Sequence, residues 1–188
     1  RRDFTINSMA MNIHPSRFGD LTDPFNGEED IKNKILRTPL NSDETFSEDP
    51  LRMMRAAYFS SKLRFKISKP LLDSMKRMSP RIEIVSAERI RDEFLKILRT
   101  DKPSIGIVAL QKSGLLKYVF PEIDRMYGMD QTSEWQHKDI FAHTLQVVDN
   151  AANLSNKMEI RFAALVHDIA KPQTRRIDKK KRVYLSWS

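Results

Sequence analysis

The 188-residue sequence contains no cysteine, only 5 glycines and no apolar run long enough to span a bilayer. Without thiols the chain forms neither disulfide bonds nor thiolate metal sites, so any metal must be bound by His, Asp or Glu. The first residues, Arg1-Arg2-Asp3, are not followed by the apolar stretch that a signal peptide needs. These absences predict a cytoplasmic protein with no membrane partner.

The composition is that of a folded, basic protein. Hydrophobic residues make up 40% of the chain and charged residues 31%, which suits one core of good size or two smaller ones. The formal net charge is +8. An excess of Lys and Arg favours a polyanionic partner, because each neutralised phosphate releases condensed counterions. The same excess also serves solubility alone, so charge leaves nucleic-acid binding open.

The character of the chain changes near Ser42. Before this residue, prolines and glycines divide the sequence into short segments, as at the end of a mixed α/β unit. A short helix over residues 5–10 and strands over 11–13 and 35–38 fit this part. After Ser42 the apolar spacing is helical, and residues 118–135 are expected to connect two helical parts. Helices are expected at residues 69–78, 103–112, 139–154 and 159–169.

The most informative segment is residues 46–55, Phe-Ser-Glu-Asp-Pro-Leu-Arg-Met-Met-Arg. Ser47 is expected to cap a helix whose first turn contains Pro50, where the missing N–H costs nothing. In this register Asp49 and Arg52 are three residues apart and share one face at the start of the helix. A carboxylate acceptor then lies beside a guanidinium donor.

Such a pair complements two of the four bases. Cytosine and adenine present an amino donor next to a ring-nitrogen acceptor, whereas uracil and guanine present a carbonyl acceptor next to a ring N–H. A wrong base would bury unpaired groups at about 1–3 kcal/mol each, so the pair can select C and A without a template. Taken alone, however, Asp49 and Arg52 are more often a first-turn acid and its solvated partner.

Three further blocks accompany this segment, at residues 1–10 (Arg-Arg-Asp-Phe-Thr-Ile-Asn-Ser-Met-Ala), 23–31 (Asp-Pro-Phe-Asn-Gly-Glu-Glu-Asp-Ile) and 88–94 (Glu-Arg-Ile-Arg-Asp-Glu-Phe). In order and spacing, the four blocks resemble the motifs of class II tRNA nucleotidyltransferases, the CCA-adding enzymes, and of the related bacterial poly(A) polymerases. The resemblance covers most of the chain. Tyr58 departs from it, because arginine is usual there, and this removes a candidate phosphate contact.

The resemblance implies a nucleotide site formed by the blocks at residues 1–10 and 46–55. Residues of block 1–10 would lie near the ribose and phosphates of an incoming nucleoside triphosphate, and residues of block 46–55 would read its base. Carboxylate and amide groups suit a ribose hydroxyl, and arginine suits phosphate oxygens. The implied nucleotide-binding residues are Arg2, Asp3, Asn7, Asp49, Arg52 and Arg55.

Other charged residues in these blocks are expected to be structural. Arg89 and Glu93 are four residues apart on a predicted helix, and we expect them to brace the helix that reads the base. Asp30 is expected to cap or brace rather than to catalyse.

The resemblance further implies a mostly α fold in three parts. Residues 1–41 are the C-terminal remnant of a mixed α/β nucleotidyltransferase head, residues 42–120 an all-helical neck that binds nucleotide and RNA, and residues 121–188 the start of a helical HD-type domain. The implied activity is template-independent addition of CMP and AMP, from CTP and ATP, to the 3′ terminus of tRNA. Poly(A) polymerase activity, which adds AMP only, stays an alternative.

Nucleotidyl transfer needs carboxylates that hold a divalent metal beside the attacking hydroxyl and the α-phosphate. In the family these carboxylates are an Asp-x-Asp pair before the Arg-Arg-Asp block, so here they would precede residue 1 and bind Mg²⁺ in the intact enzyme. The chain is therefore expected to be a fragment that contacts nucleotide and tRNA without transferring a nucleotide. Metal-dependent addition of CMP or AMP to tRNA by this chain would contradict that expectation.

Two segments nearer the C-terminus resemble the first metal-binding segments of HD-domain phosphohydrolases. One contains His143, and the other contains His167 and Asp168. Imidazole and carboxylate groups suit a divalent ion that activates water, and the resemblance implies Mn²⁺ or Ni²⁺ here, with a distal Asp beyond residue 188 as a further ligand. Alternatively, both histidines are buried and hydrogen-bonded, and Asp168 only ends a helix.

Two other classes of function stay open. The histidine and aspartate ligands would suit a metal-dependent phosphohydrolase acting on 2′,3′-cyclic phosphates. A non-catalytic basic helical module that only binds RNA would have no specific nucleotide pocket, so Asp49→Ala would leave its nucleotide affinity unchanged. The sequence does not determine the oligomeric state.

Overall fold

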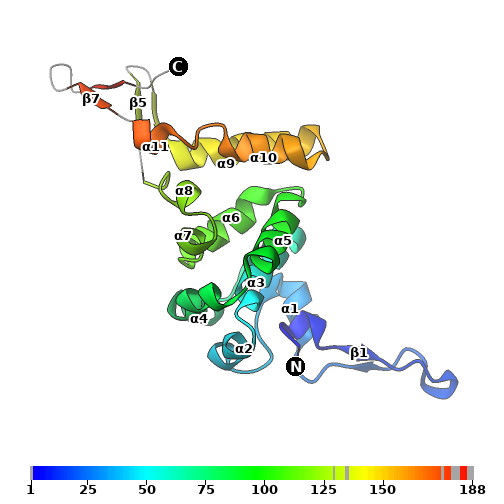
Figure 1. Ribbon diagram of the computed structural model, residues 1–188. Coiled ribbons are helices and arrows are strands. Elements are labelled where there is room, and N and C mark those ends of the chain that lie inside the picture. Colours follow the sequence, from blue (N-terminus) through cyan, green and yellow to red (C-terminus); the bar gives the residue numbers. More distant parts are fainter. Residues whose placement is uncertain (1, 129, 134–135, 175, 179–182, 186–188) are drawn as a thin grey trace.

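The computed structural model describes residues 2–128, 130–133, 136–174, 176–178 and 183–185. Helices dominate this part of the chain, and the strands form separate two-stranded pairs (Figure 1). The mostly α fold expected from the sequence is confirmed. Within the described residues, every helix is too short or too polar to cross a membrane.

The N-terminal part is built from short elements around the first helix. The first residue of that helix, Gly27, has to be a glycine, because a Cβ at this position would lie 2.5 Å from the carbonyl oxygen of Thr5. Asp30 braces the same region by accepting from the Thr5 hydroxyl at 2.7 Å and from Nε of Arg37 at 3.0 Å. An antiparallel ribbon projects away from the helices (Figure 1). The elements are η1 (Thr5–Asn7), β1 (Ala10–Met11), η2 (Pro15–Arg17), β2 (Leu21–Thr22), α1 (Gly27–Asn33) and β3 (Ile35–Leu36).

Helix α3 (Leu51–Leu63) is the centre of the middle part and packs against α5 (Ala87–Leu98) and α6 (Pro103–Lys112). Gly106 permits the close approach of α6, because a Cβ there would lie 2.5 Å from Cγ2 of Ile97 and 3.2 Å from the carbonyl oxygen of Ala57. The other elements are α2 (Ser42–Glu48), β4 (Lys66–Ile67), α4 (Lys69–Met78), η3 (Ser79–Ile84), α7 (Leu116–Val119) and α8 (Pro121–Asp124).

The sequence predicts that one helix starts in the segment around Asp49. In the structure, this segment is instead a break between two helices. Asn41 caps α2 by accepting from two backbone N–H groups of its first turn, so Ser47 lies inside α2 and its predicted capping role is wrong. Asp49 is extended, with φ −150° and ψ 100°, because a residue before proline is disfavoured in the helical region. Its carboxylate accepts from the backbone N–H of Leu51 at 3.2 Å, at the start of α3.

The C-terminal part is a pair of packed helices, α9 (Ile140–Leu154) and α10 (Met158–Val166) (Figure 1). Both lie within three residues of the helices expected from the apolar spacing. The expected connection over residues 118–135 is only partly irregular, since it contains α8 and the end of α7; residues 134–135 lie outside the described part. The remaining elements are β5 (Asp130–Ser133), β6 (Gln136–Asp139), α11 (Lys171–Thr174), β7 (Arg176–Asp178) and β8 (Val183–Leu185).

Arg161 joins the C-terminal helices to the middle part. It is 3% exposed, and its guanidinium donates to the carbonyls of Leu98 at 2.7 Å and Thr100 at 2.9 Å, at the end of α5. It also donates to the carbonyls of Ala152 at 3.1 Å and Ser155 at 2.9 Å, at the end of α9. Helix C-termini present unpaired carbonyls and the negative end of the dipole, so two helix ends neutralise one buried cation.

Asp149 makes a second connection between the same two parts. From α9, its carboxylate accepts from the backbone N–H of Ser104 at 3.0 Å and from the Ser104 hydroxyl at 2.7 Å. Ser104 lies in the first turn of α6, where N–H groups have no partner within the helix. Asp149 therefore caps a helix that is distant from it in the sequence.

We predict that Arg161→Met lowers the free energy of unfolding by about 3 kcal/mol or more, because buried carbonyls at two helix ends lose their donor. Arg161→Lys should lose less, since the ammonium keeps the charge and some of the donors. Urea unfolding followed by circular dichroism measures both. The exposed control Arg125→Met should change stability by no more than about 0.5 kcal/mol, and equal values for Arg161→Met and this control would contradict the prediction.

Candidate functional site

Asp3 is the centre of a charged cluster where the N-terminal part meets α3. It is 7% exposed and accepts from the backbone N–H of Phe4 at 3.0 Å, from Nδ2 of Asn7 at 3.0 Å and from Nε of Arg55 at 2.7 Å. Burial alone would raise the pKa of Asp3, but the hydrogen bonds from Asn7 and Arg55 outweigh it and lower the pKa below its ordinary value. Asp3 therefore stays ionised and holds η1 against α3.

A cavity of about 310 Å³ lies beside this cluster and is bordered by the starts of α3 and α5. Its volume is at the lower end of the range for small-ligand pockets. Charged groups of both signs surround it, and Leu51 supplies an apolar surface. Five of the six predicted nucleotide-binding residues line it, and Asn7 reaches it through Asp3. The lining residues are Arg2, Asp3, Asp49, Leu51, Arg52, Arg55, Arg89 and Glu93.

Asp49 and Arg52 share this cavity, although they do not share one helix. The Asp49 carboxylate pairs with Arg89 of α5 at 3.2 Å, and the Arg52 guanidinium donates to the Thr45 carbonyl at 3.1 Å and to Glu48 at 2.9 Å. The side chains of Asp49 and Arg52 are 32% and 15% exposed, so neither is sealed inside the helix interface. Their neighbours orient both groups at the wall of an open cavity.

Arg89 and Glu93, the predicted brace, do not pair with each other. Arg89 contacts Asp49 in the segment that it was expected to hold, and Glu93 accepts from Nζ of Lys96 at 2.6 Å. The other carboxylate oxygen of Glu93 is buried and has no hydrogen-bond partner within the described residues. The bracing roles themselves stay predictions.

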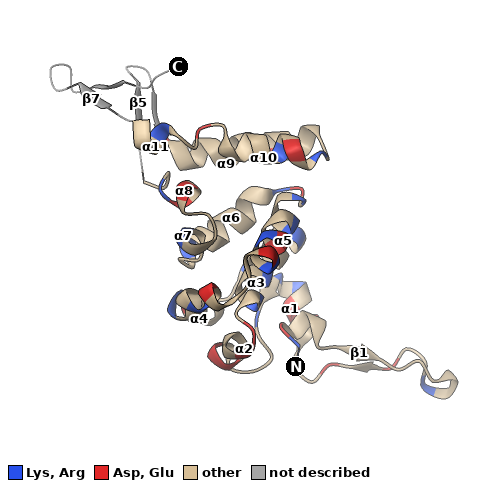
Figure 2. Ribbon diagram, in the orientation of Figure 1, with Lys and Arg blue, Asp and Glu red and all other residues tan. Residues whose placement is uncertain are grey.

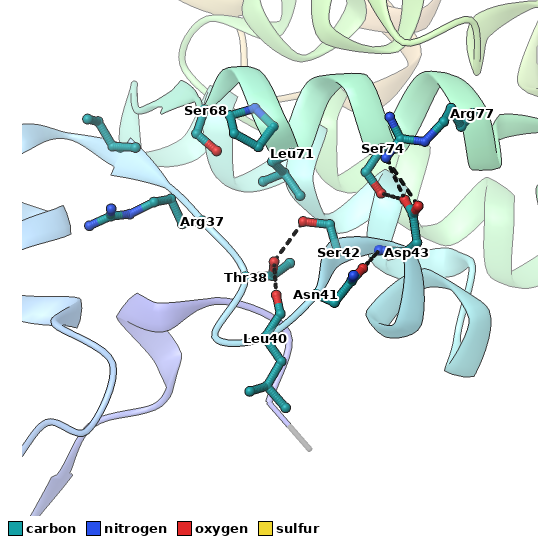
Figure 3. Close-up of a pocket in the computed structure, with 12 residues that line it drawn as sticks. Arg37, Thr38, Leu40, Asn41, Ser42, Asp43, Ser68, Leu71, Ser74 and Arg77 are labelled. Atoms are coloured by element: carbon teal, nitrogen blue, oxygen red, sulfur yellow. Dashed lines mark hydrogen bonds and ion pairs between the residues drawn. The ribbon is translucent and has the colours of Figure 1, made fainter.

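A larger cavity, of about 620 Å³, lies between the residues before α2 and helix α4 (Figure 3). Its charged groups are already paired: Asp43 accepts from Ser74 and from Arg77, and Arg37 is bound to Asp30. Figure 3 shows the Asp43, Ser74 and Arg77 side chains converging at one end of this cavity. These contacts hold α2 against α4, so the cavity has less capacity to bind a charged ligand than its volume indicates.

His143, His167 and Asp168 come together between α9 and the end of α10. One ligand atom from each lies within 4.8 Å of the others. The Nδ1 atom of His167 is 2.8 Å from the carbonyl oxygen of Ala164, which can only accept, so Nδ1 donates there and Nε2 is the ring nitrogen that faces Asp168, at 3.1 Å. This donor set fits a divalent transition metal, and the Ala164 carbonyl fixes the orientation of the imidazole, as hydrogen-bond acceptors commonly do for histidines that bind metals.

Lys171 is a further member of this cluster that the sequence analysis missed. Its Nζ lies 2.8 Å from Oδ2 of Asp168, the same oxygen that faces both histidines. The spacing of three residues on a helical turn is the signal by which this contact could have been found. A cation bound by the two imidazoles therefore shares Asp168 with an ammonium group.

Three protein-family models match successive parts of the chain. The first, described as "Poly A polymerase head domain", matches residues 1–37, and the second, "Probable RNA and SrmB- binding site of polymerase A", matches residues 64–127. The third, "HD domain", matches residues 140–186. Together they follow the order of head, neck and HD-type domain that the motifs predict.

Proteins similar over nearly the whole chain agree with these models. The "Multifunctional CCA protein" of Vibrio campbellii is 39% identical over 180 residues, which are 93% of this chain and 43% of that protein. That of Psychromonas ingrahamii is also 39% identical, and the chain covers 42% of it. The chain thus spans less than half the length of these relatives.

Among solved structures, "The structure of CCA-adding enzyme apo form I" is 26% identical, with a TM-score of 0.68, covering 90% of this chain and 38% of that one. "The complex structure of CCA-adding enzyme with CTP" has the same identity and TM-score and covers 91% of this chain and 39% of that one. The matched models thus describe a polymerase head domain, an RNA-binding part and an HD domain in succession along the chain. The chain belongs to the family of tRNA nucleotidyltransferases and bacterial poly(A) polymerases.

We predict that Arg55→Gln raises the pKa of Asp3, because burial then acts against a weaker set of hydrogen bonds. Titration of the Asp3 carboxyl by NMR measures this shift. Since the folded pKa is lowered, the stability from this cluster is present above the ordinary pKa of 3.8 and is lost as the pH falls through the folded value. Arg77→Gln is the matched control: it should raise the pKa of Asp43 and leave that of Asp3 unchanged. An unshifted Asp3 in Arg55→Gln would contradict the assignment.

Proposed function

We propose that this chain forms the nucleotide- and RNA-binding part of an enzyme that adds CMP and AMP, from CTP and ATP, to the 3′ terminus of tRNA in the cytoplasm. The observation that carries the proposal is the placement of Asp49 and Arg52 at one open cavity, beside the Asp3 and Arg55 cluster. The names of the similar proteins, which refer to CCA addition and to a complex with CTP, support it. Addition of AMP alone stays the alternative.

The proposed roles follow from the donors and acceptors around the cavity. Asp49 accepts from the amino group of cytosine or adenine, and Arg52 donates to the adjacent ring nitrogen. Because Arg89 already holds Asp49, little freedom of that carboxylate is lost when a base binds. Arg2 is exposed at the rim, where a guanidinium suits phosphate oxygens.

Asp3, Asn7 and Arg55 form the ribose side of the proposed site. The Asp3 carboxylate is buried and ionised, and its contacts with Asn7 and Arg55 fix its position, so a ribose hydroxyl would meet a preorganised acceptor. The division into head (residues 1–41), neck (42–120) and HD-type unit (121–188) belongs to the same proposal.

The transfer step itself would need carboxylates that this sequence does not contain as an Asp-x-Asp pair. In the intact enzyme we expect that pair upstream of Arg1, holding Mg²⁺, which supplies charge stabilisation at the α-phosphate when bound. The residues present here bind the nucleoside triphosphate, orient its base and exclude the wrong bases.

We predict that Asp49→Ala weakens binding of CTP and ATP to this chain by about tenfold or more, because the base loses one hydrogen bond to a charged group. Binding of UTP and GTP should change little, since their carbonyl groups gain nothing from a carboxylate. Isothermal titration calorimetry with the four nucleotides measures the selectivity. Asp101→Ala, an exposed aspartate, is the control. Unchanged affinity of Asp49→Ala for all four nucleotides would support the RNA-binding module without a nucleotide pocket.

A second candidate function is metal-dependent hydrolysis of phosphoesters, such as 2′,3′-cyclic phosphates, at the HD-type unit. The observation that favours it is the cluster of His143, His167 and Asp168, whose ligand atoms lie within 4.8 Å of one another. Mn²⁺ or Ni²⁺ fits imidazole and carboxylate ligands and would supply an activated water when bound. The chain's own residues hold and orient that site.

We predict that Mn²⁺ or Ni²⁺ binds to this chain and that His167→Ala weakens the binding at least about tenfold, through loss of one of the described ligands. Calorimetry measures binding independently of activity, and hydrolysis of a 2′,3′-cyclic nucleotide is assayed in parallel. His14→Ala, a histidine in the exposed β1–β2 ribbon, is the control. Equal metal affinity of His167→Ala and His14→Ala would sink the assignment.

A further inference from the structure

A further cavity, of about 450 Å³, lies at the C-terminal end of α3 and is bordered by β4, α4 and α6. Its floor is apolar and includes the half-buried side chains of Phe65, Leu72 and Val108. The cations Arg64, Lys66 and Lys112 border it and are exposed. We refer to it as the α3-end pocket. An apolar floor under a ring of positive charge suits a ligand that is both anionic and flat or apolar.

The three cations of the α3-end pocket are not committed to other groups. None of them makes an ion pair or a side-chain hydrogen bond within the described part of the chain, and the pocket lining contains no carboxylate. This differs from the cavities at Asp49 and Asp43, where arginines are paired with acids. Figure 2 likewise shows basic and acidic residues mixed on α5. The charge of this pocket is therefore available to a ligand.

The pocket is held in shape by local contacts. The Ser60 hydroxyl donates to the Phe65 carbonyl at 2.7 Å, which closes the turn after α3. Arg64 has a left-handed backbone, with φ 57°, and Lys66 and Ile67 pair with β3. Ser68 also donates its backbone N–H to the Leu36 carbonyl at 3.1 Å. A preformed site loses little conformational freedom when a ligand binds.

The α3-end pocket and the proposed nucleotide cavity lie at opposite ends of one helix. Leu51, the first residue of α3, lines the nucleotide cavity, and Arg64 directly follows its last residue. At about 1.5 Å per residue, the 13 residues of α3 separate the two sites by about 20 Å. One RNA molecule whose 3′ terminus lies at the nucleotide cavity can therefore also place another of its nucleotides at the α3-end pocket.

We propose that the α3-end pocket binds an unpaired nucleotide of the RNA substrate, away from its 3′ terminus. Phe65 and its apolar neighbours contact the base, and Arg64, Lys66 and Lys112 bind the adjoining phosphates. Stacking on an aromatic ring combined with cations along the backbone is the usual chemistry of unpaired RNA. The compact volume of about 450 Å³ favours this ligand over an acidic peptide, which would need an extended groove. The proposal rests on the RNA partner of the proposed function, but not on base selection at Asp49.

The test uses this chain and three fluorescent RNAs: a tRNA transcript without its terminal CCA, a single-stranded oligonucleotide and a blunt-ended duplex of two fully paired strands. In Lys66→Gln/Lys112→Gln, affinity for the first two should fall at least about tenfold at low salt. The negative slope of log K against log[salt] should become shallower by about 1.5, because two phosphate contacts are lost. Arg125→Gln/Lys157→Gln removes the same charge far from the pocket and should retain wild-type affinity and slope.

A second variant separates the base from the phosphates. Phe65→Leu should weaken binding of the single-stranded RNA several-fold with an unchanged salt slope, because stacking is lost and no charge is removed. Binding of the blunt-ended duplex should be insensitive to Phe65→Leu. Thermal unfolding of each variant verifies that it is folded. If Phe65→Leu is unfolded, the binding measurement is made with Phe65→Ile instead.

Several outcomes would overturn the proposal. Wild-type affinity and slope in Lys66→Gln/Lys112→Gln would show that the pocket does not bind RNA. An equal effect of Phe65→Leu on paired and unpaired RNA, or displacement of the RNA by polyglutamate of matched charge, would show general anion binding. Loss of CTP selectivity in Asp49→Ala with intact RNA binding would instead support the pocket as an RNA site separate from the nucleotide cavity. A wild-type chain that binds no tRNA refutes the RNA partner of the proposed function itself.

Discussion

The ion pair between Asp3 and Arg55 is the contact on which the candidate nucleotide site depends. It joins residues 52 positions apart and unites an irregular N-terminal turn with the central helix of the middle part. Because Asp3 is buried, its charge persists only through the donors around it, so its position is fixed by Asn7, Arg55 and the backbone of Phe4. The wall formed by α3 and the wall formed by the N-terminal part thereby become one surface.

Charged contacts around the cavity differ in what they contribute. The Asp49–Arg89 pair is partly exposed, at 32% and 54%, and such pairs add little to stability. Its value is directional, since it aims a carboxylate at the cavity. The buried Arg161 network has the opposite character: it touches no candidate ligand site and fixes how α5 and α9 meet. The Arg161 network thus stabilises the packing away from the candidate site, whereas the Asp49–Arg89 pair shapes that site.

The sequence sufficed where the signal is local or carried by a motif. Helices such as 69–78 and 103–112 follow from apolar spacing. The motif blocks predict that Asp3 and Asp49 lie close together, and both residues line one cavity. The break at Asp49 was missed because Ser47 is a good cap by type, and the competing cap at Asn41 lies outside the motif. Arg161 was missed because its acceptors are backbone carbonyls up to 63 residues away, which no side-chain pattern marks.

Asp149 bears on how such proteins diversify. Its carboxylate completes a helix that belongs to the neighbouring part of the chain, so the C-terminal helices and the middle part share a structural contact. A recombination event that replaced the C-terminal helices with unrelated ones would leave the first turn of α6 without its acceptor. The C-terminal helices and the start of α6 are therefore physically coupled, and any replacement of those helices would have to supply this acceptor again.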